Sequence, residues 1–119
     1  MNIKTHKDLN VWKRSIEFVT KIYSITTKFP YDEKYGLVQQ MRRSAVSIPS
    51  NIAEGAARHS IKEYIQFLYI SLSSLSELET QLIISEKLMF ITDHKKQLLG
   101  ELVVIRKQLL ALIKSLKKS

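Results

Sequence analysis

The stretch that decides the fold is residues 98–116, LLGELVVIRKQLLALIKSL. Its apolar residues recur every three or four positions over three heptads, which is the spacing of one face of an α-helix. This series consists of Leu98, Leu102, Ile105, Leu109, Leu112 and Leu116. A second apolar line runs beside it and consists of Leu99, Val103, Leu110 and Ile113. One line can pack inside a bundle, and the second indicates a further packing partner.

Three earlier segments show comparable periodicity, and only three glycines and two prolines interrupt the chain. We therefore predict an all-α protein with one domain over residues 1–119. Its helices are expected at about residues 9–28, 32–57, 60–88 and 92–117. Because the connections between these helices are short, neighbouring helices should alternate in direction. The predicted architecture is an antiparallel up-and-down four-helix bundle.

Three local signals mark the helix ends and one irregularity. Ser60 and Glu63 have the spacing of a capping box, in which each side chain bonds the backbone amide of the other residue. Thr92 is a candidate cap for the last helix. Pro49 falls inside the second predicted helix, where its missing amide donor predicts a kink.

The first predicted helix also carries two apolar stripes. One consists of Trp12, Ile16, Val19 and Tyr23, and the other of Val11, Phe18, Ile22 and Ile25. A domain of 119 residues cannot bury two wide faces on each helix. We therefore predict a homo-oligomer in which the surplus apolar lines of the first and fourth helices meet between subunits in a closed ring.

The composition predicts a soluble, cytoplasmic protein with an affinity for polyanions. The chain has no cysteine, its amino-terminal segment MNIKTHKDLN has no apolar core like that of a signal peptide, and its longest uncharged run, residues 64–76, is shorter than a membrane span. The net charge is +8 and the pI is about 9.8. Nucleic acid is the first candidate partner for such a charge, although lysine can also serve solubility alone.

No pattern in the chain is typical of catalysis or metal binding. The residues three positions before His6, His59 and His94 are not glutamates, so the Glu-x-x-His motif of di-metal bundles is absent. The glycines are too scattered for a phosphate-binding loop, and no serine lies in a Gly-x-Ser-x-Gly elbow. We expect a protein that is not an enzyme and that needs no cofactor and no metal.

Basic residues are concentrated on the first, second and fourth predicted helices. The candidate nucleic-acid contacts are Lys13, Arg14, Lys21, Arg42, Arg43, Arg106, Lys107 and Lys114. Lys114 also has a structural explanation, because cations near the carboxyl end of a helix stabilise its dipole. Arg42 and Arg43 lie in mid-helix, where we expect either a polyanion or an ion pair.

A polar block around Pro49 is the most unusual part of the chain. Asn51, Glu54 and Gly55 follow the proline, and the two polar residues lie one helical turn apart. They could form a binding site. The structural interpretation is that both side chains are buried and satisfy backbone groups freed by Pro49, with Glu54 also able to pair with Arg58.

This block carries a family resemblance. Residues 36–43 and 47–55, together with the matching segments 8–12, 67–68 and 77–82, closely resemble the four helix bundle protein family, also called the intervening-sequence protein of large-subunit ribosomal RNA. Ser71 and Ser73 depart from the alanine and glycine that the family favours, which should loosen helix packing slightly.

The resemblance implies ring-like homopentamers around a central channel, and some members are encoded inside sequences that interrupt ribosomal RNA genes. A similar barrel is the accessory protein of diversity-generating retroelements, which binds nucleic acid and a reverse transcriptase. Two hypotheses follow. The protein is a nucleic-acid-binding accessory for RNA or DNA, or it is a protein adaptor that binds a partner helix and whose charge is incidental.

Overall fold

Helices are the only regular elements in the computed structural model, which describes residues 5–93 and 95–119. The four α-helices are α1 (Asn10–Thr26), α2 (Leu37–Ala56), α3 (Ile61–Lys87) and α4 (Lys95–Lys117). Two short 3-10 helices, η1 (His6–Asp8) and η2 (Tyr31–Glu33), precede α1 and α2. The described residues contain no strand, so the predicted all-α class with four helices is confirmed.

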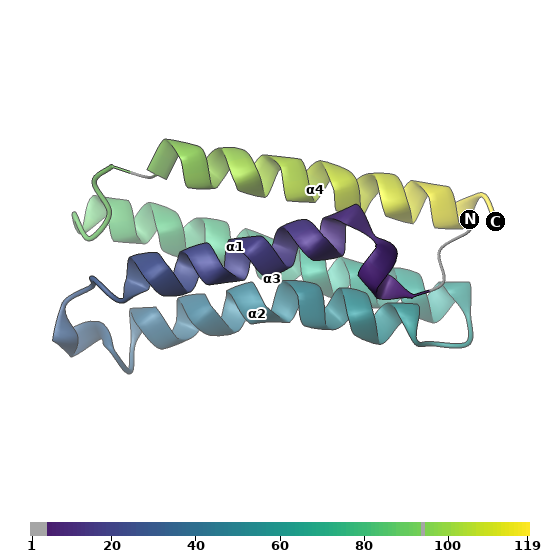
Figure 1. The fold of residues 1–119 in the computed structure, drawn as a ribbon, viewed down its shortest axis with the longest axis horizontal. Helices are drawn as coiled ribbons and strands as arrows, with labels where there is room; N and C mark the ends of the chain where they lie inside the picture. Colours follow the sequence, from purple (N-terminus) through teal and green to yellow (C-terminus); the bar gives the residue numbers. More distant parts are fainter. Residues whose placement is uncertain (1–4, 94) are drawn as a thin grey trace.

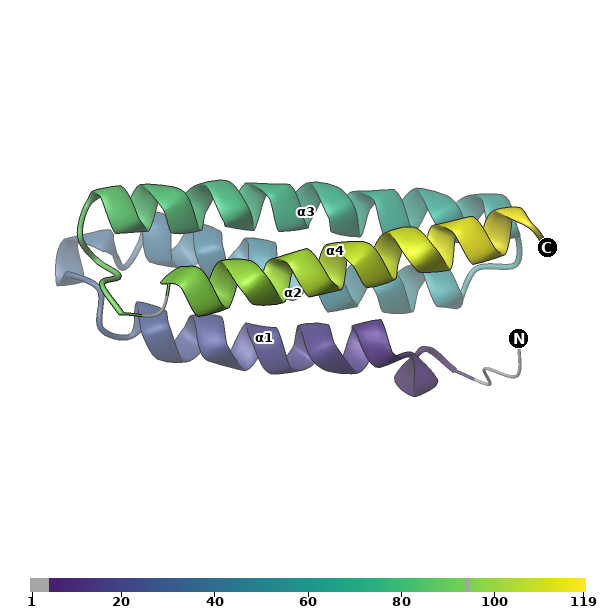
Figure 2. The same ribbon diagram turned by 90° about the horizontal axis from the view of Figure 1, so that it is seen from above.

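The four helices lie side by side along the longest dimension of a body that measures 46 × 25 × 19 Å. Figure 1 shows the α1–α2 and α3–α4 connections at one end, and the α2–α3 connection and the carboxyl end of α4 at the other. Seen from above, α4 lies between α3 and α1 in projection (Figure 2). Of the neighbouring helix pairs, α2 and α3 share the most extensive interface and α1 and α4 the smallest.

Two helices begin later than predicted. α2 begins at Leu37 rather than near residue 32, because the chain after Pro30 forms a tight turn whose amides bond three residues back, as in Glu33 N–H to Pro30 O at 2.9 Å. α4 begins at Lys95 rather than near residue 92. Thr92 therefore lies in a bend before the helix and is not adjacent to it, so the predicted cap is wrong. His94 lies outside the described residues.

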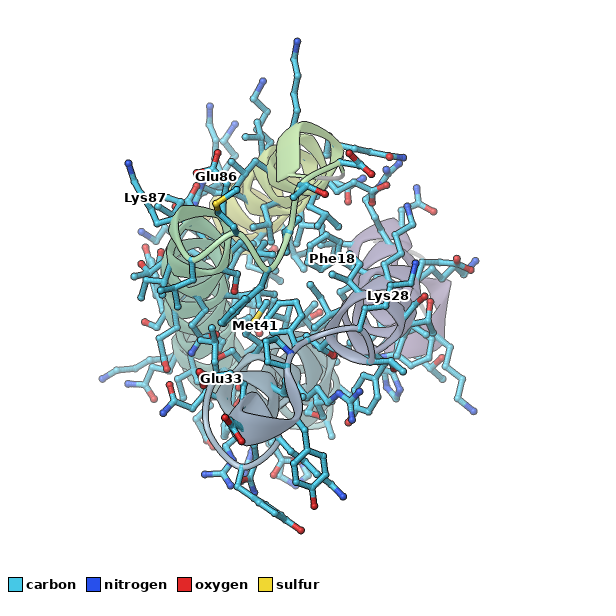
Figure 3. The ribbon with its side chains drawn as sticks, turned by 90° about the vertical axis from the view of Figure 1, so that its left-hand side faces the viewer. Phe18, Lys28, Glu33, Met41, Glu86 and Lys87 are labelled. Atoms are coloured by element: carbon cyan, nitrogen blue, oxygen red, sulfur yellow. The ribbon has the colours of Figure 1, made fainter. Side chains whose placement is uncertain are left out.

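The core confirms the apolar seam of α4. All six of its members are buried, whereas Val103 and Leu110 of the second line stay about half exposed. On α1 the core is filled by the stripe that contains Phe18 and Ile22. The view along the bundle shows Phe18 and Met41 pointing into the space between the helices and Lys87 pointing outward (Figure 3). Ile113 of the second line is also buried, and Leu99, Trp12 and Val19 pack against the core. Only part of the surplus predicted from the sequence therefore lies at the surface of a single chain: Ile16, Tyr23, Val103 and Leu110.

Small residues bring α2 and α3 close together. A methyl group placed on Gly55 would lie 2.8 Å from Phe67 Cβ, which is closer than real side chains approach, and 3.1 Å from the backbone oxygen of Tyr64, which is a tight contact. Farther along, the buried Ser71 hydroxyl donates to Ile48 O at 2.9 Å. The hydroxyl of Ser71 thus adds a bond between the two helices at this position.

Candidate nucleic-acid interface

The three basic candidates on α1 line a groove between α1 and α4. The groove has a volume of about 610 Å³, and its walls are formed by Asn10, Lys13, Arg14, Glu17, Lys21, Glu101 and Gln108. Lys21 forms an ion pair across the groove with Glu101. Glu17 adds a second carboxylate to the walls. The groove is therefore of mixed charge, and Lys21 already has a partner, while Lys13 and Arg14 are exposed.

The three basic candidates on α4 differ in their surroundings. Arg106 Nη2 lies 3.1 Å from Glu79 Oε1 of α3, in an ion pair whose side chains are each about one-third exposed. Lys107 and Lys114 are exposed, and neither forms an ion pair with another described residue. Arg106 therefore contributes to the α3–α4 contact, whereas the charges of Lys107 and Lys114 remain at the surface.

Arg42 joins α2 to the carboxyl end of α1. Its Nε donates to Thr26 Oγ1 at 3.0 Å, and its Nη2 donates to Tyr23 O at 3.3 Å and to Thr27 Oγ1 at 3.4 Å. The guanidinium carbon lies 4.5 Å from the centre of the Tyr23 ring. A cation is favoured here, because the last carbonyls of a helix carry partial negative charge. These bonds give Arg42 a structural role without an ion pair, and its contact with a polyanion stays a prediction.

Arg43 is exposed and lines a cleft of about 440 Å³ between the ends of α1 and α2. The other lining residues of this cleft are Tyr23, Tyr35, Val38, Gln39, Arg42 and Val46. A second cleft of about 220 Å³ also includes Arg42, together with Tyr31 and Lys34. Neither cleft has an aspartate or glutamate in its lining. The predicted pair Arg42–Arg43 is thus part of a larger basic and aromatic area.

We call this area the Tyr–Arg surface. It consists of Tyr23, Tyr31, Lys34, Tyr35, Arg42 and Arg43. Tyr31 and Tyr35 are each 78% exposed, and the Lys34 ammonium lies 5.8 and 5.5 Å from the centres of their rings. The tyrosines and Lys34 were not among the binding residues predicted from the sequence. The two tyrosines and the lysine of residues 31–35 are close together in the sequence. Their position beside Arg42, however, follows from the turn between α1 and α2.

The polar block around Pro49 has a structural role that differs from the predicted one. α2 continues through Pro49, and the kink there stays a prediction. Asn51 is half-buried and donates to Ser47 O at 2.8 Å and to Ser47 Oγ at 2.9 Å. The carbonyl freed by a proline is that of the residue four positions earlier, here Ala45, so Asn51 does not satisfy it.

The prediction that Glu54 is buried is wrong. Its side chain is 56% exposed, because Ile52 and Gly55 occupy the inward positions of this turn. Glu54 instead pairs with Arg58 at 3.2 Å, as the i, i+4 spacing predicts. The capping box of α3 is formed in part. The Glu63 amide donates to Ser60 Oγ at 3.1 Å, and the Glu63 carboxylate accepts from the Ser60 hydroxyl at 3.2 Å.

The described residues contain no group of three or more histidine, cysteine, aspartate or glutamate side chains that could hold a metal ion. His6 packs edge-on against Trp12 with the ring centres 5.1 Å apart, and His59 is exposed. None of the described helices is both long and apolar enough to cross a membrane.

The fold and this surface define an all-helical bundle protein with a basic, tyrosine-bearing area at one end. The family described as 23S rRNA-intervening sequence protein matches residues 7–111, and the chain belongs to this family. The predicted resemblance is thereby confirmed. No curated protein matches the sequence.

A solved structure has a similar fold. It is the crystal structure, at 1.70 Å resolution, of a protein of unknown function from the S23 ribosomal protein family of Bacteroides thetaiotaomicron VPI-5482. The two chains are 27% identical, with a TM-score of 0.77, and the match covers 87% of this chain and 98% of the other. Neither the family description nor this relative names a catalytic activity.

Proposed function

We propose that the protein is a non-enzymatic, cytoplasmic accessory protein that associates with RNA or DNA as a homo-oligomer. The observation that carries this proposal is a set of five predicted nucleic-acid contacts that are exposed and form no ion pair with the described residues. The set consists of Lys13, Arg14, Arg43, Lys107 and Lys114. The family description, which refers to 23S ribosomal RNA, supports RNA as the first partner to test.

The apolar residues left at the surface of α1 and α4 support the proposed assembly. Ile16 is 39% exposed, Val103 is 42% exposed and Leu110 is 48% exposed. Gln108 adds a buried Oε1 without a hydrogen-bond partner among the described residues, at the wall of the α1–α4 groove. We propose that each subunit is an antiparallel up-and-down bundle and that neighbouring subunits cover these apolar faces in a closed ring. The family resemblance favours a ring of five copies.

A ring would repeat the charge of each chain around its circumference. With +8 per subunit, the field of the assembly would attract the phosphate backbone at long range. Contacts of this kind carry little sequence preference, because phosphates are the same at every nucleotide. The expected activity is therefore salt-sensitive binding to many sequences.

The test of nucleic-acid binding is fluorescence anisotropy with labelled RNA and DNA over a series of salt concentrations. Affinity should fall with a logarithmic slope of about −0.9 per neutralised phosphate for duplex DNA and about −0.7 for single strands. Arg43→Glu and Lys114→Glu should each weaken binding to all sequences and reduce the slope by about 1. Lys62→Glu is the matched control, because Lys62 is also exposed but lies outside the set.

Two outcomes would contradict the proposal. Binding that is unchanged by salt and by both charge reversals would favour the protein-adaptor hypothesis, in which a partner helix binds the exposed apolar residues. Light scattering that finds only a monomer at micromolar concentration would remove the ring.

A further inference from the structure

The Tyr–Arg surface has a different charge pattern from the α1–α4 groove. Lys34, Arg42 and Arg43 line its two clefts without a carboxylate, whereas the groove contains Glu17 and Glu101. The acids nearest in sequence, Asp32 and Glu33, are outside both linings. An anionic ligand would therefore meet cations in the cleft linings here and carboxylates in the groove.

One cation of this surface is held in place before any ligand arrives. The bonds from Arg42 to Thr26, Thr27 and Tyr23 use its Nε and Nη2 atoms, which leaves its Nη1 donors for a ligand. The Tyr23 ring, at 4.5 Å, supports one face of the guanidinium. Because its rotamer is already restricted, Arg42 would lose little freedom on binding a phosphate.

The aromatic rings of the surface are unusually open. Tyr31 and Tyr35 are each 78% exposed, which is more than any other exposed aromatic residue that the structure describes. The Lys34 ammonium lies over both rings, 5.8 Å from the centre of the Tyr31 ring and 5.5 Å from that of Tyr35. A planar ring with a free face next to cations offers a stacking partner for an unpaired base, while the cations contact the adjoining phosphates.

We infer that the Tyr–Arg surface binds a single-stranded segment of nucleic acid, with unpaired bases stacked on Tyr31 and Tyr35 and phosphates bound by Arg42 and Arg43. This inference rests on the proposed function and names the ligand class of one site within it. A duplex cannot use the tyrosines, because its bases are stacked on one another. An acidic peptide would use the cations but has no bases to stack on the rings.

The experiment compares three RNA probes of equal length. They are a polyadenylate strand, a strand made only of abasic nucleotides, and a duplex. The double variant Tyr31→Leu/Tyr35→Leu should lose about tenfold in affinity for polyadenylate and keep its affinity for the other two probes. The double variant Tyr31→Phe/Tyr35→Phe keeps both rings and should bind like the unmodified protein.

Tyr69→Leu is the matched control for position. Tyr69 is also an exposed tyrosine beside a cation, with Lys117 Nζ 5.7 Å from its ring centre, but it lies on α3. The Tyr69→Leu variant should bind all three probes with the affinity of the unmodified protein. Circular dichroism should show the same helix content in every variant, because Tyr31 and Tyr35 bury little surface.

The outcomes separate this inference from the proposed function. Salt-sensitive RNA binding that the leucine variant leaves unchanged, or weakens equally for all three probes, would overturn base stacking and leave the proposed function standing. An equal loss in the phenylalanine variant would also overturn it. If the unmodified protein bound none of the probes, or bound a polyglutamate peptide as tightly as polyadenylate, the proposed function itself would fail.

Discussion

The α2–α3 interface and the α1–α4 groove differ in how closely their helices pack. The α2–α3 interface is close, and the α1–α4 groove is open. At α2–α3, the backbones approach so closely at Gly55 that no space is left for an added methyl group, and the Ser71 hydroxyl bonds across the interface. At α1–α4, long side chains such as Lys21 and Glu101 face each other across a groove of about 610 Å³. Small residues thus permit the close contact between α2 and α3, whereas long charged side chains line the open groove between α1 and α4.

The two regions also differ in how their polar groups are satisfied. Between α2 and α3, the hydroxyls of Ser47 and Ser74 lie 2.7 Å apart and bond each other. Beside the α1–α4 groove, the buried Gln108 Oε1 has no partner among the described residues. Buried polar atoms are normally bonded, and one other such oxygen, Gln81 Oε1 of α3, also has no partner among the described residues.

The largest expected effect comes from adding one methyl group at the α2–α3 interface. Gly55→Ala should lower the free energy of unfolding by about 1–3 kcal/mol, because the new Cβ would overlap Phe67 and the backbone of Tyr64. Gly100→Ala on α4 is the matched control, since nothing lies within 4 Å of the added Cβ. It should raise stability by about 0.5–1 kcal/mol through helix propensity.

Urea unfolding of the two glycine variants measures this difference directly. Opposite signs are expected for the two substitutions. If Gly55→Ala were as stable as the unmodified protein, α2 and α3 would be able to separate at little cost, and the contrast between the two regions would be lost.

A smaller effect is expected from the ion pair that crosses the α1–α4 groove. A double-mutant cycle with Lys21→Met and Glu101→Gln should give a coupling energy of about 0.2–1 kcal/mol, because both side chains are partly exposed to water. The coupling should decrease as salt is added. A coupling above this range that is insensitive to salt would show that the groove is closed and dry in solution.

The smallest effect concerns Tyr64, which lies against Gly55 at the α2–α3 interface. Burial raises the pKa of Tyr64 above its usual value of 10.0, because the charged phenolate is disfavoured away from water. The unfolded chain therefore releases this proton first as the pH rises. Stability from this group is complete below pH 10.0 and is lost as the pH rises through the folded-state pKa.

Tyr64→Phe has no such proton and should show a flatter loss of stability above pH 10.0. Thermal unfolding of both proteins over an alkaline pH series is the measurement. Parallel curves for the two proteins would mean that the hydroxyl of Tyr64 is solvated in the folded state.

Much of the fold could be predicted from the sequence because the relevant interactions are local. The spacing of Leu102, Ile105 and Leu109 identified the buried face of α4, and the i, i+4 spacing of Glu54 and Arg58 identified their pair. The start of α2 could not be predicted, because the tight turn after Pro30 competes with a helix that the same residues could also form. The ring and the nucleic-acid partner stay predictions.

The candidate site was predicted less well, because its residues are brought together by the turn between two helices. Charge alone did not distinguish Arg42, which bonds to the end of α1, from Arg43, which stays exposed. By itself, the sequence determined the helical class, the core seam and the excess of positive charge, since these depend on composition and on spacing within one helix. Only the tertiary structure decided which cations are already bonded and which tyrosines lie beside them, because these neighbours depend on how α1 and α2 pack.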